Sequence, residues 1–204
     1  MELYDSEEQQ VEAIKDWWKE NGKAVIFGAV IGLGGLFGWR YYQDSVVEAR
    51  EAASESYTSV ISALDAKGVD AQSDIQAFID ANKDAEYSVL AAMQLAKAQV
   101  QAGDLAAALE QLEWAKSATK DAALAPLLTY RVARIKAEQG EFDAALTDLE
   151  AMTDESWKGR VAELRGDISL RKGDTDAAYS AYSEAQQAAD ASQTLQIKLD
   201  DLAK

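Results

Sequence analysis

One stretch near the N-terminus, Ala24 to Trp39, limits what this chain can fold into more than any other feature. Its sixteen residues include no charge, no proline and no strongly polar side chain. As a helix the stretch covers about 24 Å, which falls short of the roughly 30 Å hydrocarbon core of a bilayer. Basic and aromatic residues at both ends can complete the span: Lys23, Arg40, Trp17, Trp18, Trp39, Tyr41 and Tyr42. The sequence therefore predicts one transmembrane helix in a lipid bilayer, over residues 23–42.

Two alternatives to a membrane anchor are open at this point. A buried helix of a soluble domain can be as apolar, although aromatic residues confined to its rims are uncommon there. A cleaved signal peptide has an apolar core of similar length. However, the 23 residues before the stretch carry seven acids and three lysines, and the following WRYY motif lacks the small residues of a cleavage site. We therefore expect an anchor that is retained.

Glycines inside the span predict contact with another membrane helix. Gly28 with Gly32, and Gly34 with Gly38, form two small-x-x-x-small pairs, which let a second backbone approach closely in lipid. We expect the contact along one side of the helix, at a set of residues that we call the glycine stripe: Gly28, Gly32, Gly35 and Trp39. Self-association through the same stripe is an alternative.

Residues 1–22 predict a cytoplasmic amphipathic helix ahead of the anchor. Ser6 to Gln9 has the pattern of a capping box, and Asn21-Gly22 predicts the end of the helix. Three lysines precede the span and two arginines follow it, which slightly favours a cytoplasmic N-terminus. Because the helix is acidic, it can dock on a basic cytosolic surface of a membrane partner, or it can lie on the membrane.

Residues 43–204 predict a helical soluble domain, so the fold class is all-α. The whole chain has one proline, and no sustained alternation of β-branched residues is present. A helix should continue from the anchor to about Leu64, because no breaker occurs before Gly68. The domain is also acidic, with 16 basic and 29 acidic residues after Gln43, which disfavours a nucleic-acid partner.

A repeated motif organises this domain. Gly103, Gly140 and Gly173 are each followed by an acid, and an alanine comes five residues after each glycine. Each copy reads as helix, tight turn, helix, with a fainter copy at Gly68. Small residues precede each turn by seven positions and larger ones follow it by nine: Ala96, Ala133 and Gly166, then Leu112, Leu149 and Tyr182. The acids are expected to cap the second helices.

The period near 34 residues resembles that of tetratricopeptide repeats, in which helix pairs stack into a solenoid. A terminal helix over residues 195–202 is expected to shield the final repeat. A three-helix bundle with chance similarity is the alternative. With no His and no Cys, catalytic triads that use those residues, His-ligated metals and thiol redox pairs are excluded. We expect no enzyme, no metal site and no cofactor.

Together these features resemble the YfgM-type ancillary subunits of the bacterial SecYEG translocon, over essentially the full length. The most specific motifs are Trp17-Trp18, Glu20 to Lys23, Gly38 to Tyr41, Leu164 to Asp167 and Lys172 to Asp174. The resemblance implies a single-pass inner-membrane protein with a cytoplasmic N-terminus and a periplasmic tetratricopeptide-like domain, residues 43–204. It also implies association with the translocon, with a membrane-anchored periplasmic chaperone of prolyl-isomerase type, and with emerging secretory chains. The family defines no catalytic residues.

The leading functional interpretation is an adaptor that links protein export to periplasmic chaperones. Because tyrosine and arginine concentrate in binding hot spots, five residues of the repeats are candidate partner contacts: Tyr130, Arg131, Arg134, Tyr179 and Tyr182. The alternative is an envelope stress regulator that binds a signalling protein through the cytosolic N-terminus.

Overall fold

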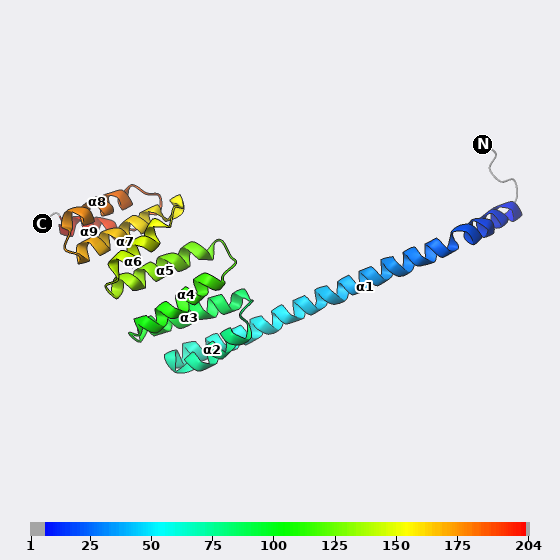
Figure 1. The fold of residues 1–204 in the computed structure, drawn as a ribbon, viewed down its shortest axis with the longest axis horizontal. Helices are drawn as coiled ribbons and strands as arrows, with labels where there is room; N and C mark the ends of the chain where they lie inside the picture. The colour runs from blue at the N-terminus through cyan, green and yellow to red at the C-terminus, as the bar shows by residue number, and fades with distance from the viewer. Residues whose placement is uncertain (1–6, 203–204) are drawn as a thin grey trace. The chain divides into compact units, whose positions relative to one another are not determined.

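The computed structural model describes residues 7–202, with side chains from residue 10 onward. The chain divides into two compact units, residues 1–52 and 53–204. Every regular element in the described range is a helix, which confirms the all-α prediction (Figure 1). The capping box at Ser6 lies outside the described residues.

The first unit is built from helix α1, Glu7–Lys67, whose last turns belong to the second unit. The predicted end at Asn21-Gly22 is wrong, because α1 continues through both residues. Gly22 keeps a right-handed backbone, the ring of Trp18 lies against it, and the Asn21 amide bonds back to the carbonyl of Trp17 at 3.0 Å. A continuous helix also leaves no backbone group unpaired at the entrance to the apolar stretch. The predicted end near Gly68 is confirmed.

The apolar part of α1 is not a core helix. Only 6% of its most hydropathic 18-residue window is buried, and by length and composition it is the one candidate membrane span among the described residues. Side chains such as Phe27, Ile31 and Phe37 are exposed along it. This exposure contradicts the alternative of a buried helix in a soluble domain.

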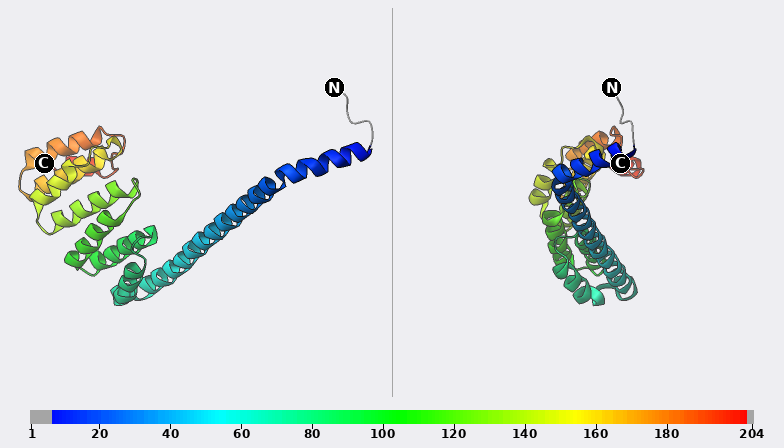
Figure 2. Two further views of the ribbon diagram at one scale, coloured as in Figure 1. Left: turned by 45° about the vertical axis from the view of Figure 1, so that its right-hand side comes forward. Right: turned by 90° about the vertical axis from the view of Figure 1, so that its right-hand side faces the viewer.

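The second unit is a succession of helical hairpins, which Figures 1 and 2 show following one another in chain order. Its elements after α1 and a short 3₁₀ turn, Gly68–Ala71, are α2 (Gln72–Ala81), α3 (Glu86–Gln101), α4 (Leu105–Ala118), α5 (Leu124–Glu138), α6 (Phe142–Glu150), a 3₁₀ turn (Glu155–Trp157), α7 (Lys158–Arg171), α8 (Thr175–Gln186) and α9 (Leu195–Leu202). The pairs α3–α4, α5–α6 and α7–α8 pack as hairpins, and α4 packs on α5.

The turn glycines are where the repeat predicts them. Gly103, Gly140 and Gly173 have φ values of +85°, +82° and +83°, a left-handed conformation that side chains with a Cβ rarely adopt. At each turn the next residue donates its N–H to a carbonyl five residues back, at 2.9 Å in all three turns. This is the closing bond of a Schellman motif. One local geometry therefore reverses the chain three times.

The predicted caps are confirmed at two turns and wrong at the third. The carboxylates of Asp104 and Asp174 each accept the N–H three residues on, both at 3.0 Å. Glu141 occupies the same position before α6, but its side chain makes no cap. Its extra methylene carries the carboxylate beyond the short reach that suits aspartate at this position.

This difference predicts unequal effects of matched substitutions. Asp174→Ala should lower the free energy of unfolding by about 1 kcal/mol, because it leaves an N-terminal N–H of α8 unsatisfied. Glu141→Ala removes the same charge from the equivalent turn and should change stability by less than about 0.5 kcal/mol. Chemical denaturation of the full chain, followed by circular dichroism, measures both. Equal losses would contradict the assignment of the caps.

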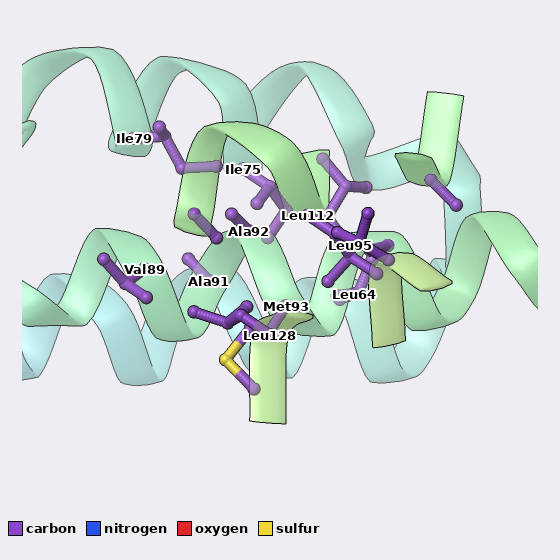
Figure 3. Close-up of a cluster of buried hydrophobic side chains, with 14 of the residues drawn as sticks. Leu64, Ile75, Ile79, Val89, Ala91, Ala92, Met93, Leu95, Leu112 and Leu128 are labelled. Atoms are coloured by element: carbon purple, nitrogen blue, oxygen red, sulfur yellow. The ribbon is translucent and has the colours of Figure 1, made fainter. Parts of the chain in front are cut away.

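The interior confirms the alternation of small and large residues. Ala96, Ala133 and Gly166 are buried, and so are the larger residues that follow the turns, Leu112, Leu149 and Tyr182. The largest apolar cluster joins the end of α1 to α2, α3, α4 and α5. In Figure 3, Leu64, Ile75, Leu95 and Leu112 gather at its centre. Smaller clusters follow between α5, α6 and α7, and between α7, α8 and α9.

Helix α9 closes the final repeat, as predicted. Leu195 and Leu199 are buried against Tyr182 and three alanines of α7 and α8. The segment before α9 also caps α7, because Asp190 accepts the N–H of Gly159 at 2.7 Å. The last hairpin therefore has neither an open apolar face nor an uncapped helix start at this point.

Candidate functional site

The three glycines of the glycine stripe face open space within the described chain, and the ring centre of Trp39 lies 6.3 Å from that of Tyr42. A Cβ added at Gly28, Gly32 or Gly35 would meet no atom within 4 Å outside its own helix backbone, and Trp39 is exposed. The packing of this chain therefore does not require these glycines. Their small size would matter only if another helix approached, so membrane-helix contact stays a prediction.

A cavity of about 270 Å³ lies between α3, α4 and α5 in the second unit. We call it the α3–α5 groove. Most of its apolar lining residues are buried, and Val100 is 41% exposed. Its lining residues are Met93, Ala96, Lys97, Val100, Gln101, Leu105, Leu112, Arg131, Arg134, Ile135 and Glu138.

Two of the predicted partner-contact residues, Arg131 and Arg134, line this groove. They are three residues apart on α5, so they project from the same side of the helix. Arg131 is half-buried and Arg134 is exposed. The structure thus places two predicted contacts beside an apolar hollow that the sequence did not reveal.

The three predicted tyrosines lie in different environments. Tyr130 is half-buried with its ring centre 5.6 Å from that of Trp157. Burial raises the pKa of its hydroxyl, and the charge of Arg134 acts against that rise. Tyr179 on α8 is 52% exposed and is available to a partner. Tyr182 is only 1% exposed, so it is a core residue and not a partner contact.

Tyr182 belongs to a polar network that connects α9 to α7 and α8. Its hydroxyl donates to Oδ1 of Asp167 at 2.7 Å, and Nζ of Lys198 donates to the same oxygen at 2.6 Å. Lys198 also pairs with Glu163 at 2.9 Å. Burial lowers the pKa of Lys198, but its bonds to the two carboxylates outweigh that effect and the pKa is raised. Burial and the bond to Asp167 both raise the pKa of Tyr182.

A second ionic network connects successive hairpins, and sequence reasoning missed it. Asp148 on α6 accepts from Lys116 on α4 at 3.0 Å and from Lys136 on α5 at 2.9 Å. Burial raises the pKa of Asp148, but hydrogen bonds from the two lysines reverse that effect and lower it. These residues stabilise the stack of hairpins. No group of three or more potential metal ligands forms among the described side chains.

Lys97 is the cation of the groove that sequence reasoning missed, although the repeat contains a signal for it. Lys97 lies six residues before Gly103, and Arg134 lies six before Gly140, so the two occupy the same position in successive hairpins. An alignment of the repeats places these two cations at the same position.

Comparison with known proteins agrees with this architecture. A family model described as a tetratricopeptide repeat-like domain matches residues 15–204. Three curated relatives bear the name ancillary SecYEG translocon subunit. The protein from Haemophilus influenzae is 35% identical over 198 residues, which cover 96% of this chain and 97% of the relative. The protein from Escherichia coli K12 is 35% identical over 206 residues, or 99% of each chain. The protein from Aggregatibacter actinomycetemcomitans is 33% identical over 199 residues, with 96% and 97% covered.

These matches extend over the anchor and the hairpins alike. The similarity therefore spans nearly the full length of this chain and of each relative. The chain belongs to the family of ancillary SecYEG translocon subunits and carries a tetratricopeptide repeat-like domain.

Proposed function

We propose that this chain is a non-enzymatic ancillary subunit of a bacterial SecYEG translocon and acts as a membrane-anchored adaptor. The observation that carries the proposal is the full-length similarity to proteins of that name, which includes both the exposed apolar helix and the hairpins. The absence of His and Cys from the sequence also favours a role in binding over catalysis.

The proposed topology is that of a single-pass inner-membrane protein. Residues 1–22 lie in the cytoplasm, residues 23–42 cross the bilayer and residues 43–204 lie in the periplasm. Support comes from the lysines before the span and from the exposed side chains along it. In this arrangement the hairpins meet chains that emerge from the channel.

The adaptor role assigns different tasks to the two units. The glycine stripe contacts a membrane helix of the translocon, and the hairpins bind a membrane-anchored periplasmic chaperone of prolyl-isomerase type or an emerging secretory chain. Support comes from the open space beside the glycines of the stripe and from the two arginines that line the α3–α5 groove. Exposed Tyr179 is a further candidate contact.

Substitution of the stripe tests the proposal. Gly28→Leu with Gly32→Leu should reduce co-purification with SecYEG in mild detergent several-fold, because two leucines keep another backbone at a distance. Gly34→Leu with Gly38→Leu adds the same volume at the second small-x-x-x-small pair, on a different side of the same helix, and so tests whether the contact is confined to the glycine stripe. Recovery should then stay near that of the unaltered chain.

Two results would change the interpretation. Unchanged recovery of the Gly28/Gly32 variant would remove the stripe contact. Loss of crosslinks between copies of this chain, with SecYEG recovery intact, would assign the stripe to self-association. Deleting residues 1–20 separates the adaptor from a stress regulator, because only the regulator should lose its partner.

A further inference from the structure

We infer that the α3–α5 groove binds an acidic segment of a partner protein, with a bulky apolar side chain in the hollow and a carboxylate on the arginines. The inference rests on the proposed adaptor function and specifies the chemistry of its partner. It depends on three features of the groove: its volume, its charge and the ion pair that engages its single acid, Glu138.

The groove has room for a bulky side chain, and its volume lies close to the lower end of the range for small-molecule sites. Small-molecule sites usually measure about 300–1,000 Å³, and the groove measures about 270 Å³. Met93, Leu112 and Ile135 supply a buried apolar floor, and Val100 leaves part of the edge exposed. A leucine or phenylalanine that entered would bury apolar surface on both partners.

The charge of the groove is opposite to that of the protein. The chain has a net charge of −16, yet Lys97, Arg131 and Arg134 all line this one hollow. Within the described part of the chain, none of the three forms an ion pair. Most other cations from α4 to α9 do hold a carboxylate: Lys116, Lys136, Lys158, Arg165, Arg171, Lys172 and Lys198.

The single acid in the lining does not neutralise these cations. Oε1 of Glu138 is 2.5 Å from Nη2 of Arg171 on α7. Arg171 also donates to the carbonyl of Ala137 at 3.0 Å, which holds it in place. Glu138 is therefore paired with a residue of the next hairpin. Lys97, Arg131 and Arg134 remain able to bind a carboxylate of another molecule. Arginine suits this role because its fork can bind both carboxylate oxygens.

Fluorescence anisotropy with a synthetic peptide tests the inference on the full chain in phosphatidylcholine nanodiscs. The probe is dye-labelled Gly-Asp-Glu-Leu-Phe-Glu-Asp-Gly. We expect saturable binding with a Kd below about 1 mM, weakened by added salt. Two further peptides should bind at least about tenfold more weakly: one with amides in place of the acids, and one with serines in place of Leu-Phe.

Matched variants locate the binding. Arg131→Gln with Arg134→Gln should raise the Kd about tenfold or more. Lys67→Gln with Lys120→Gln removes two unpaired charges away from the groove and should change the Kd less than about twofold. Circular dichroism of each variant verifies that the hairpins remain folded.

Several outcomes would overturn the inference. They are no saturable binding to the unaltered chain, equal effects of the two variants, and equal binding of the peptide without Leu-Phe, which would indicate an anion site. A dimer that depends on the two arginines would assign the groove to a second copy. Because the peptide assay needs no translocon, loss of SecYEG recovery with intact peptide binding would affect only the proposed function.

Discussion

Replacing Ile31 and Leu33 with arginine is expected to move the protein from the membrane pellet to the supernatant. Both residues lie near the middle of the span and both are exposed. Each arginine at a helix centre costs about 2.5–3.5 kcal/mol on insertion scales. The span has little to offset that cost, because five of its sixteen core residues are glycines that add almost no apolar surface.

The test is ultracentrifugation after cell lysis, with the N-terminus of each variant determined by mass spectrometry. Leu170→Arg with Ile197→Arg is the control, since it adds the same two charges at exposed apolar positions of the second unit. That variant should stay in the pellet. If the unaltered chain, with its first residues intact, were found in the supernatant, the membrane anchor would be refuted.

The second large effect is expected at Gly166. A Cβ added there would lie 2.5 Å from Cδ1 of Tyr182, far inside normal contact. The ring cannot move aside easily, because it is buried and its hydroxyl is bonded to Asp167. Alanine improves helix propensity by about 1 kcal/mol, but overpacking should outweigh that gain. We expect Gly166→Ala to lower the free energy of unfolding by about 1–3 kcal/mol.

A double variant tests the cause of this effect. The other repeats pair alanine with leucine at the equivalent positions, Ala96 with Leu112 and Ala133 with Leu149. Gly166→Ala with Tyr182→Leu recreates that pairing. The decrease in free energy of unfolding in the double variant should be smaller than the sum of the decreases in the two single variants, by about 1 kcal/mol or more. Denaturant titration measures all three variants. A Gly166→Ala protein more stable than the unaltered chain would contradict the described packing.

Several elements were predictable because their cause is local. A left-handed turn favours glycine, so Gly103, Gly140 and Gly173 marked the hairpins directly. The aspartate caps followed from the same motif. The end predicted at Asn21-Gly22 was wrong, because a glycine in the middle of a helix and a glycine at its end look alike in sequence.

The candidate contacts divided according to tertiary packing. Arg131 and Arg134 lie at a groove, Tyr179 is exposed and Tyr182 is buried. The sequence identified the residue types that favour binding, but a tyrosine can contact a partner or fill a core with the same side chain. The position of Tyr182 in the repeat indicated that it would be buried. The residues at the same position in the other hairpins, nine after the turn glycine, are buried leucines.

The apolar helix, the order of the hairpins and their turns could be predicted from sequence, because charge, hydropathy and backbone conformation are properties of short stretches. Which side chains remain available to a partner depends on how the helices pack. Lys97 and Arg134 are 37 residues apart, and their shared groove exists only where α3 and α5 lie close together. The ion pair of Glu138 also depends on packing, because its partner Arg171 belongs to another hairpin.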